Sequence, residues 1–62
     1  MKEFQVIVYG DVGDIISSSH FENEPTDELL DELISDGKKL ECYEVEGDDY
    51  SKLLFTMDNE EY

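Results

Sequence analysis

The sequence predicts an α+β domain in which a small, mostly antiparallel sheet carries one helix across one face, in the order ββαββ. Two stretches rich in β-branched and aromatic residues are each interrupted by a turn of Gly and Asp, which is typical of β-hairpins. A single amphipathic stretch lies between them, and 62 residues leave room for only one domain. We therefore expect one domain over residues 1–57, followed by an acidic tail over residues 58–62.

The first hairpin is expected between residues 3 and 21. In "EFQVIVYG", Phe4, Val6 and Val8 alternate with Ile7 and Tyr9, so both faces carry apolar side chains and the strand should lie inside the sheet. The segment "GDVGD" then supplies the Gly and Asp residues of a tight reversal. The second arm, "DIISSSHF", contains three consecutive serines that contribute little packing, which favours a position at the sheet edge.

The helix is expected to begin after Thr26, which follows the only proline and has the character of an N-cap. Asp27 and Glu28 then favour the positive end of the helix dipole. Gly37, followed by two lysines, indicates the C-terminal end. One apolar stripe should dock on the sheet, formed by Leu29, Leu30, Leu33 and Ile34.

The second hairpin is expected over "KLECYEVEGDDYSKLLFTMD", with "EGDD" as its turn. Its first arm is ambiguous, because Tyr43 and Val45 share one face whereas Leu40 and Cys42 share the other. We favour Tyr43 as the core residue. The face of the sheet without a helix would then expose an apolar patch beside Glu44 and Glu46, formed by Ile7, Tyr9, Leu40, Cys42 and Leu54.

The charge of the chain excludes several partners. Eighteen Asp and Glu oppose four Lys and no Arg, for a formal net charge of -14. Nucleic acid and anionic membranes are bound through Lys and Arg, so neither is expected as a direct partner. Solubility of a small domain needs a net charge of only about 2 to 8 in magnitude, and a larger excess costs stability through self-repulsion. A basic partner protein explains that excess better than solubility does.

The acids of the predicted helix have a notable linear spacing. Five carboxylates over residues 27–36 give about one charge per 3 Å of helix axis, compared with one phosphate per about 3.4 Å of a DNA strand. The simpler interpretation is a solvated polar face, and for the helix alone it remains the more economical one. Acids interleaved with tyrosine in the second hairpin favour a contact surface. The predicted partner-binding residues are Asp27, Glu28, Asp31, Glu32, Asp36, Glu44, Glu46, Asp48, Asp49 and Tyr50.

Catalysis, metal binding and cofactors are not expected. The serines that precede His20 lack a nucleophile elbow, and the acidic segments do not fit the spacing of a calcium loop. His20 and Cys42 are too few for a zinc site. The chain has one cysteine, its N-terminus lacks the pattern of a signal peptide, and it contains no apolar run of about 20 residues. These features favour a cytoplasmic protein.

No motif identifies a family. In size and charge, the whole chain resembles the small, acidic, Arg-poor inhibitors of phages and mobile elements, which include DNA-mimic anti-restriction, anti-CRISPR and polymerase-inhibiting proteins. The resemblance implies a non-enzymatic protein that occupies the basic, nucleic-acid-binding site of a host protein. The alternative is a structural or assembly protein that forms a homodimer, or docks on a larger complex, through the open apolar face of its sheet.

Overall fold

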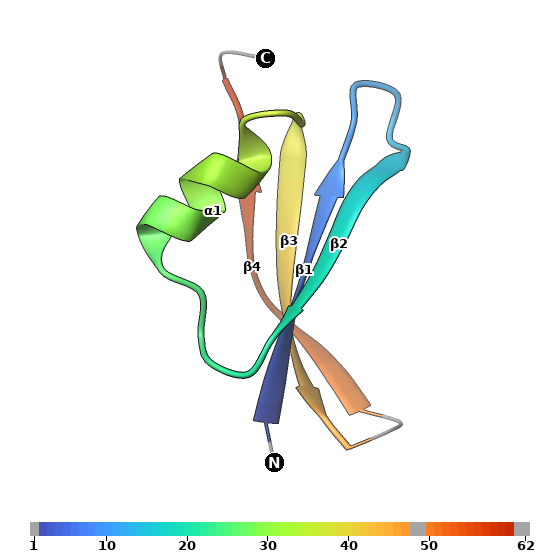
Figure 1. Ribbon diagram of the computed structural model, residues 1–62. Helices are drawn as coiled ribbons and strands as arrows, with labels where there is room; N and C mark the ends of the chain where they lie inside the picture. Colours follow the sequence, from blue (N-terminus) through green and yellow to red (C-terminus); the bar gives the residue numbers. More distant parts are fainter. Residues whose placement is uncertain (1, 48–49, 61–62) are drawn as a thin grey trace.

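The computed structural model describes residues 2–47 and 50–60, including all of their side chains except those of Lys2 and Tyr50. Over these residues the chain forms β1 (Lys2–Tyr9), β2 (Ile15–Phe21), α1 (Asp27–Ile34), β3 (Lys39–Glu46) and β4 (Tyr50–Asp58). Every strand pair is antiparallel, the spatial order is β2-β1-β3-β4, and α1 lies on one side of the sheet (Figure 1). The predicted α+β class and ββαββ order are confirmed.

The core lies between α1 and the two central strands. β1 is interior, as its two-sided apolar pattern predicts, and β2 is an edge strand, as its serines predict. The register places Val6 opposite Cys42 and Val8 opposite Leu40, so these four side chains share the face that α1 covers. The buried hydrophobic residues are Val6, Val8, Leu30, Ile34, Leu40 and Cys42.

The register corrects the predicted faces of β3 and β4. Leu40 and Cys42 have no exposed surface and belong to the core, whereas Tyr43 lies half-buried on the other face. The reason is the pairing with β1, which brings Leu40 and Cys42 opposite the two buried valines. The register of β4 shifts between the partners of Cys42 and Tyr43, so Leu54 packs partly against the core as well. The expected apolar patch containing Leu40, Cys42 and Leu54 is therefore wrong.

α1 begins where the sequence predicts and ends slightly earlier. Thr26 is the N-cap, and its Oγ1 accepts a hydrogen bond of 3.3 Å from the backbone N–H of Leu29. The helix ends at Ile34, so Asp36, expected as a helix acid, lies in the turn that follows. The chain leaves the helix here to reach the end of β1, where the Lys38 N–H donates to the Tyr9 carbonyl at 2.8 Å.

The end of β4 holds the end of α1 in place. Asp58 is the last residue of β4, and the Asn59 side-chain amide donates to the carbonyl oxygens of Ile34 and Gly37, both at 3.0 Å. The Asn59 N–H also donates to the Lys38 carbonyl at 2.8 Å. Asp58 and Asn59, predicted to belong to the tail, are thus joined to the folded domain. The Ile34 carbonyl also accepts from the Gly37 N–H at 2.9 Å, so Asn59 adds a second hydrogen bond at the end of α1.

Replacing Asn59 by alanine should destabilise the protein. The Asn59→Ala variant loses both side-chain hydrogen bonds to the end of α1, for an expected loss of about 1 to 2 kcal/mol in the free energy of unfolding. Urea denaturation followed by circular dichroism measures this loss. The matched control is Asn23→Ala in the exposed connector before α1, which should change stability by less than about 0.5 kcal/mol. Equal losses in the two variants would contradict the role of Asn59.

Candidate functional site

The exposed side of α1 is the strongest candidate surface. The helix sequence DELLDELI repeats a pair of acids and a pair of apolar residues, so the two kinds of side chain occupy opposite sides. Leu30 and Ile34 are buried in the core, and this anchors the helix with its acids directed to solvent. We call the four exposed carboxylates the acidic face of α1: Asp27, Glu28, Asp31 and Glu32.

Within the part of the chain that the structure describes, no cation pairs with the acidic face of α1. The ion pairs of the described residues join Lys38 Nζ to Asp11 Oδ1 at 4.0 Å and Lys39 Nζ to Glu41 Oε2 at 3.9 Å, and neither includes a helix acid. The last turn of α1 carries no basic residue. Like charges four residues apart on a helix cost roughly 0.2 to 0.5 kcal/mol per pair. A cationic surface that approached the helix would relieve this repulsion.

The structure does not gather all the predicted binding residues around α1. Glu44 is half-buried and Glu46 is exposed, and both occupy the end of β3 away from α1 in Figure 1. In the sheet register Glu44 lies opposite Lys52, so this acid has a lysine as its cross-strand neighbour, unlike the acids of α1. Asp48 and Asp49 lie outside the described residues, as does the side chain of Tyr50.

A polar cluster on the face without a helix was not predicted. The Glu41 carboxylate accepts a hydrogen bond of 3.1 Å from the Tyr43 hydroxyl and a second one from the Tyr9 hydroxyl. The bond to Glu41, followed by burial, raises the pKa of Tyr9 to about 12, and the bond from Tyr9 is the main cause that lowers the pKa of Glu41. Alternation along β3 puts Glu41 and Tyr43 on one face, but only the pairing with β1 brings Tyr9 to them.

Removing the Tyr9 hydroxyl should alter stability in a pH-dependent way. The folded protein keeps the Tyr9 proton up to about pH 12, whereas the unfolded chain releases it near pH 10. The stabilisation from the Tyr9 hydroxyl is therefore fully present below pH 10 and is lost as the pH rises to about 12. The pKa of Glu41 is lowered from 4.5, so its contribution is present above pH 4.5 and lost as the pH falls below that value. Tyr9→Phe should therefore be less stable than the wild type at neutral pH.

Denaturant unfolding across the pH range tests this expectation. The stability difference between wild type and Tyr9→Phe should shrink at both the acid and the alkaline end. Ile7→Val, a change on the same face without a titrating group, should give a difference that does not depend on pH. Parallel profiles for wild type and Tyr9→Phe would show that the hydrogen bond to Glu41 contributes nothing.

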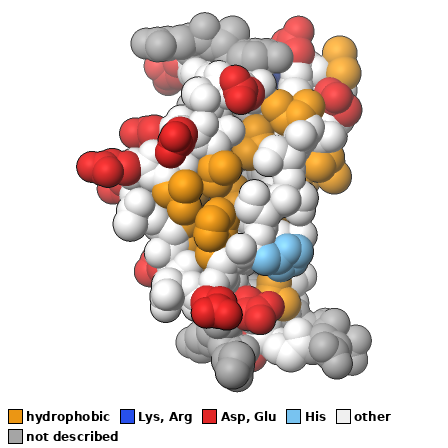
Figure 2. All heavy atoms as spheres, in the orientation of Figure 1, with side chains coloured by type: hydrophobic (Ala, Val, Ile, Leu, Met, Phe, Trp, Pro, Cys, Tyr) orange, Lys and Arg blue, Asp and Glu red, His pale blue; other side chains and the backbone are white. Residues whose placement is uncertain are grey.

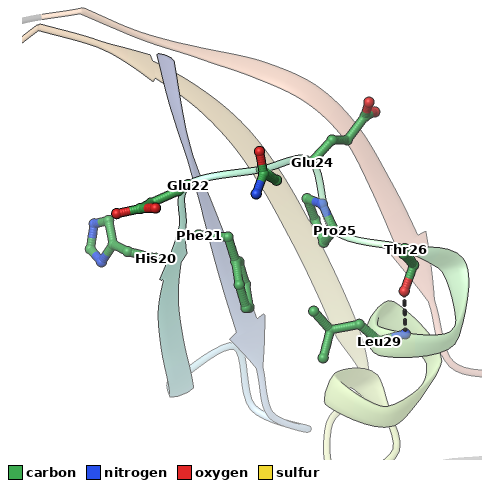
Figure 3. Close-up of a pocket in the computed structure, with 8 residues that line it drawn as sticks. His20, Phe21, Glu22, Glu24, Pro25, Thr26 and Leu29 are labelled. Atoms are coloured by element: carbon green, nitrogen blue, oxygen red, sulfur yellow. Dashed lines mark hydrogen bonds between the residues drawn. The ribbon is translucent and has the colours of Figure 1, made fainter. Parts of the chain in front are cut away.

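A shallow depression opens where β2, the connector and α1 meet (Figure 3). Its volume is about 440 Å³. The side chains of Phe21, Pro25 and Leu29 point toward one another in it, one from each segment, and Glu22 and Glu24 belong to its lining. The depression therefore combines apolar walls with two acidic residues at its border, whose side chains extend away from Phe21 and Leu29 (Figure 3).

The groups considered for chemistry lie apart or are covered. Cys42 is buried in the core, where burial raises the pKa of its thiol, whereas His20 is exposed on β2. Across residues 2–47 and 50–60, no three His, Cys, Asp or Glu side chains are placed to hold a metal ion. In the same part of the chain, no helix is long and apolar enough to cross a membrane.

Comparison with known proteins adds no relative. No protein-family model, curated protein or solved structure matches this chain.

Proposed function

We propose that the protein is a small, non-enzymatic binding protein that occupies the basic, nucleic-acid-binding site of another protein. The observation that carries the proposal is the acidic face of α1: four exposed carboxylates without a cationic partner among the described residues, on a helix anchored by buried Leu30 and Ile34. Inhibitors of the kind made by phages and mobile elements, directed at restriction, CRISPR or polymerase proteins, act through a surface of this character.

The physical advantage of such a surface is electrostatic. Repulsion among the helix acids is present in the free protein and falls when lysines and arginines of a partner approach. A net charge of -14 also attracts a basic partner over a distance of about one Debye length and speeds encounter. Binding should therefore weaken steeply as salt is added.

The distribution of charge supports a contact on the side that carries α1. Figure 2 shows carboxylates over α1 and toward both ends of the molecule, around a patch of hydrophobic side chains between α1 and β2. An apolar area with a charged surround is the usual anatomy of a protein interface. The acidic face of α1 and this neighbouring patch can contact one partner together.

Charge reversal on α1 tests the proposal. The immobilised protein should retain a nucleic-acid-binding protein from a host lysate, and excess duplex DNA should release it. For the retained protein, Asp31→Lys with Glu32→Lys should weaken binding about tenfold or more at physiological salt. The control is Glu3→Lys with Asp11→Lys, which changes the net charge equally at exposed positions outside α1. Equal weakening by the two double variants, or retention that DNA does not affect, would contradict the proposal.

A second candidate function is assembly through the face of the sheet that lacks a helix. The observation that favours it is Leu53, which lies opposite Tyr43 on that face and is 46% exposed. Half-buried Ile7 and Val45 share the face, so a homodimer or a larger complex would cover apolar surface there. This candidate predicts salt-tolerant self-association in analytical ultracentrifugation that Leu53→Ala weakens.

A further inference from the structure

β2 is a sheet edge without the usual protection. Among the described residues it pairs only with β1, and its seven residues include no Lys, Arg, Asp or Glu, although 35% of the chain is charged. β4, at the other edge, carries Lys52 and Asp58, and its register shift falls in the middle of the strand. The shift in β2 falls at its start, so Ser17–Phe21 remain regularly paired. Charges and bulges block the addition of a further strand, and the regular part of β2 has neither.

The two ends of β2 carry negative charge. Exposed Asp14 precedes the strand, and exposed Glu22 and Glu24 follow it. A second copy paired antiparallel about Ser18 would place Asp14 opposite Glu22 twice, at a cost in like-charge repulsion. An extended segment with basic residues near its ends would meet opposite charge at both places. Charge complementarity therefore favours a basic segment of a different protein over a second copy.

The depression beside the C-terminal end of β2 fits the side chain of such a residue. Phe21 is the last residue of β2, so a strand added along this edge would pass the opening between Phe21, Pro25 and Leu29. The aliphatic part of Lys or Arg packs on apolar walls while its charged end stays near carboxylates. Glu22 and Glu24 belong to the border of the depression, and their side chains extend outward from it (Figure 3), where they can meet the charged end of such a residue.

We propose that β2 accepts an extended basic segment of a partner protein as a fifth strand, with one Lys or Arg side chain in the depression between β2 and α1. Main-chain hydrogen bonds to a sheet edge supply affinity in this mode of recognition, and side-chain pockets beside the edge supply specificity. The inference rests on the proposed function, because it gives the same basic partner a second contact.

The test uses the full chain and a defined peptide. The probe is a short peptide of alternating Thr and Val with an Arg near each end, and its control has the same charges but prolines in the middle, which cannot join a sheet. Amide hydrogen exchange by NMR should slow roughly tenfold or more along β2 with the first peptide, and not along β4. The proline peptide should shift signals of acidic residues without slowing exchange in β2.

Matched variants locate the contact. Ser18→Lys and Thr56→Lys add the same charge at exposed positions of the two edge strands, and the register puts both on the face away from α1. Ser18→Lys should weaken peptide binding several-fold, and Thr56→Lys should leave it nearly unchanged. A peptide in which citrulline replaces Arg should bind less tightly and lose its effect on the signals of Phe21 and Leu29.

Other results would overturn the inference. The proline peptide could slow amide exchange along β2 as much as the first peptide does. The first peptide could instead slow exchange along β4 alone, or leave exchange along β2 unchanged. Self-association of the free protein that Ser18→Lys abolishes would mean that a second copy covers this edge. The charge reversal at Asp31 and Glu32 separates the two proposals. It should weaken binding of the host partner, whereas the peptide should still slow amide exchange along β2. If duplex DNA does not release the retained partner, the proposed function is contradicted, and the peptide experiment still tests strand addition at β2.

Discussion

Replacing Gly37 by alanine is expected to lower the free energy of unfolding by about 3 kcal/mol, near the upper end of the costs of overpacking. A Cβ atom at Gly37 would overlap Val8 Cγ1 and lie 2.9 Å from the Tyr9 carbonyl oxygen. Both atoms belong to β1, the interior strand on which the core is built. The neighbouring hydrogen bond from the Lys38 N–H to Tyr9 holds the two segments at this separation, so the backbone cannot move away without losing it.

Gly10→Ala is the matched control for Gly37→Ala. A Cβ at Gly10 would first meet Asp14 Oδ1 at 2.8 Å, and the end of a flexible, exposed side chain can rotate away. We expect this variant to lose less than about 1 kcal/mol. Urea denaturation of both variants measures the difference. Similar losses would mean that the crossing from α1 to β3 is looser than the contacts at Gly37 indicate.

Replacing Leu40 by alanine is expected to cost about 2 to 5 kcal/mol, since it leaves a cavity in the core. Leu40 has no exposed surface, and it lies between Val8 of β1 and Met57 of β4 in the sheet register. The free energy of unfolding of the domain should be small, because a chain of about 60 residues buries only about 60% of its unfolded surface. Leu40→Ala should therefore be substantially unfolded at physiological temperature.

Leu53→Ala removes the same atoms from the same sheet at a site that is 46% exposed, on the opposite face. We expect it to cost less than about 1 kcal/mol, since much of that surface is already in water. Thermal and urea denaturation of the two variants compare the faces directly. A greater loss for Leu53→Ala than for Leu40→Ala would reverse the assignment of faces in β3 and β4.

The stability of the core and the proposed function depend on each other through α1. The helix is only eight residues long, too short to be stable alone in water, and its acids repel one another. Burial of Leu30 and Ile34 against the sheet must offset both costs. Loss of the core in Leu40→Ala should therefore also abolish partner binding, whereas Asp31→Lys with Glu32→Lys should weaken binding in a protein that remains folded. Circular dichroism of each variant separates the two causes.

Much of the fold follows from local patterns in the sequence. Two hairpins, a helix that begins after Thr26 and the ββαββ order were predictable, because turn residues, an N-cap and apolar periodicity act over a few neighbouring residues. The acidic face of α1 was predictable for the same reason. Its exposure follows once the opposite stripe of leucines docks on the sheet.

Three features were decided only by the tertiary structure: the face of β3 that enters the core, the Tyr9–Glu41–Tyr43 cluster and the depression beside Phe21. In residues 40–45 each face carries two apolar side chains and one Glu, so a shift of one residue in register would reverse every side chain without violating the pattern. Leu40 and Cys42 enter the core because the pairing of β3 with β1 sets them beside Val6 and Val8, beneath α1. That choice is made by contacts between segments far apart in the chain, and local periodicity carries no information about them.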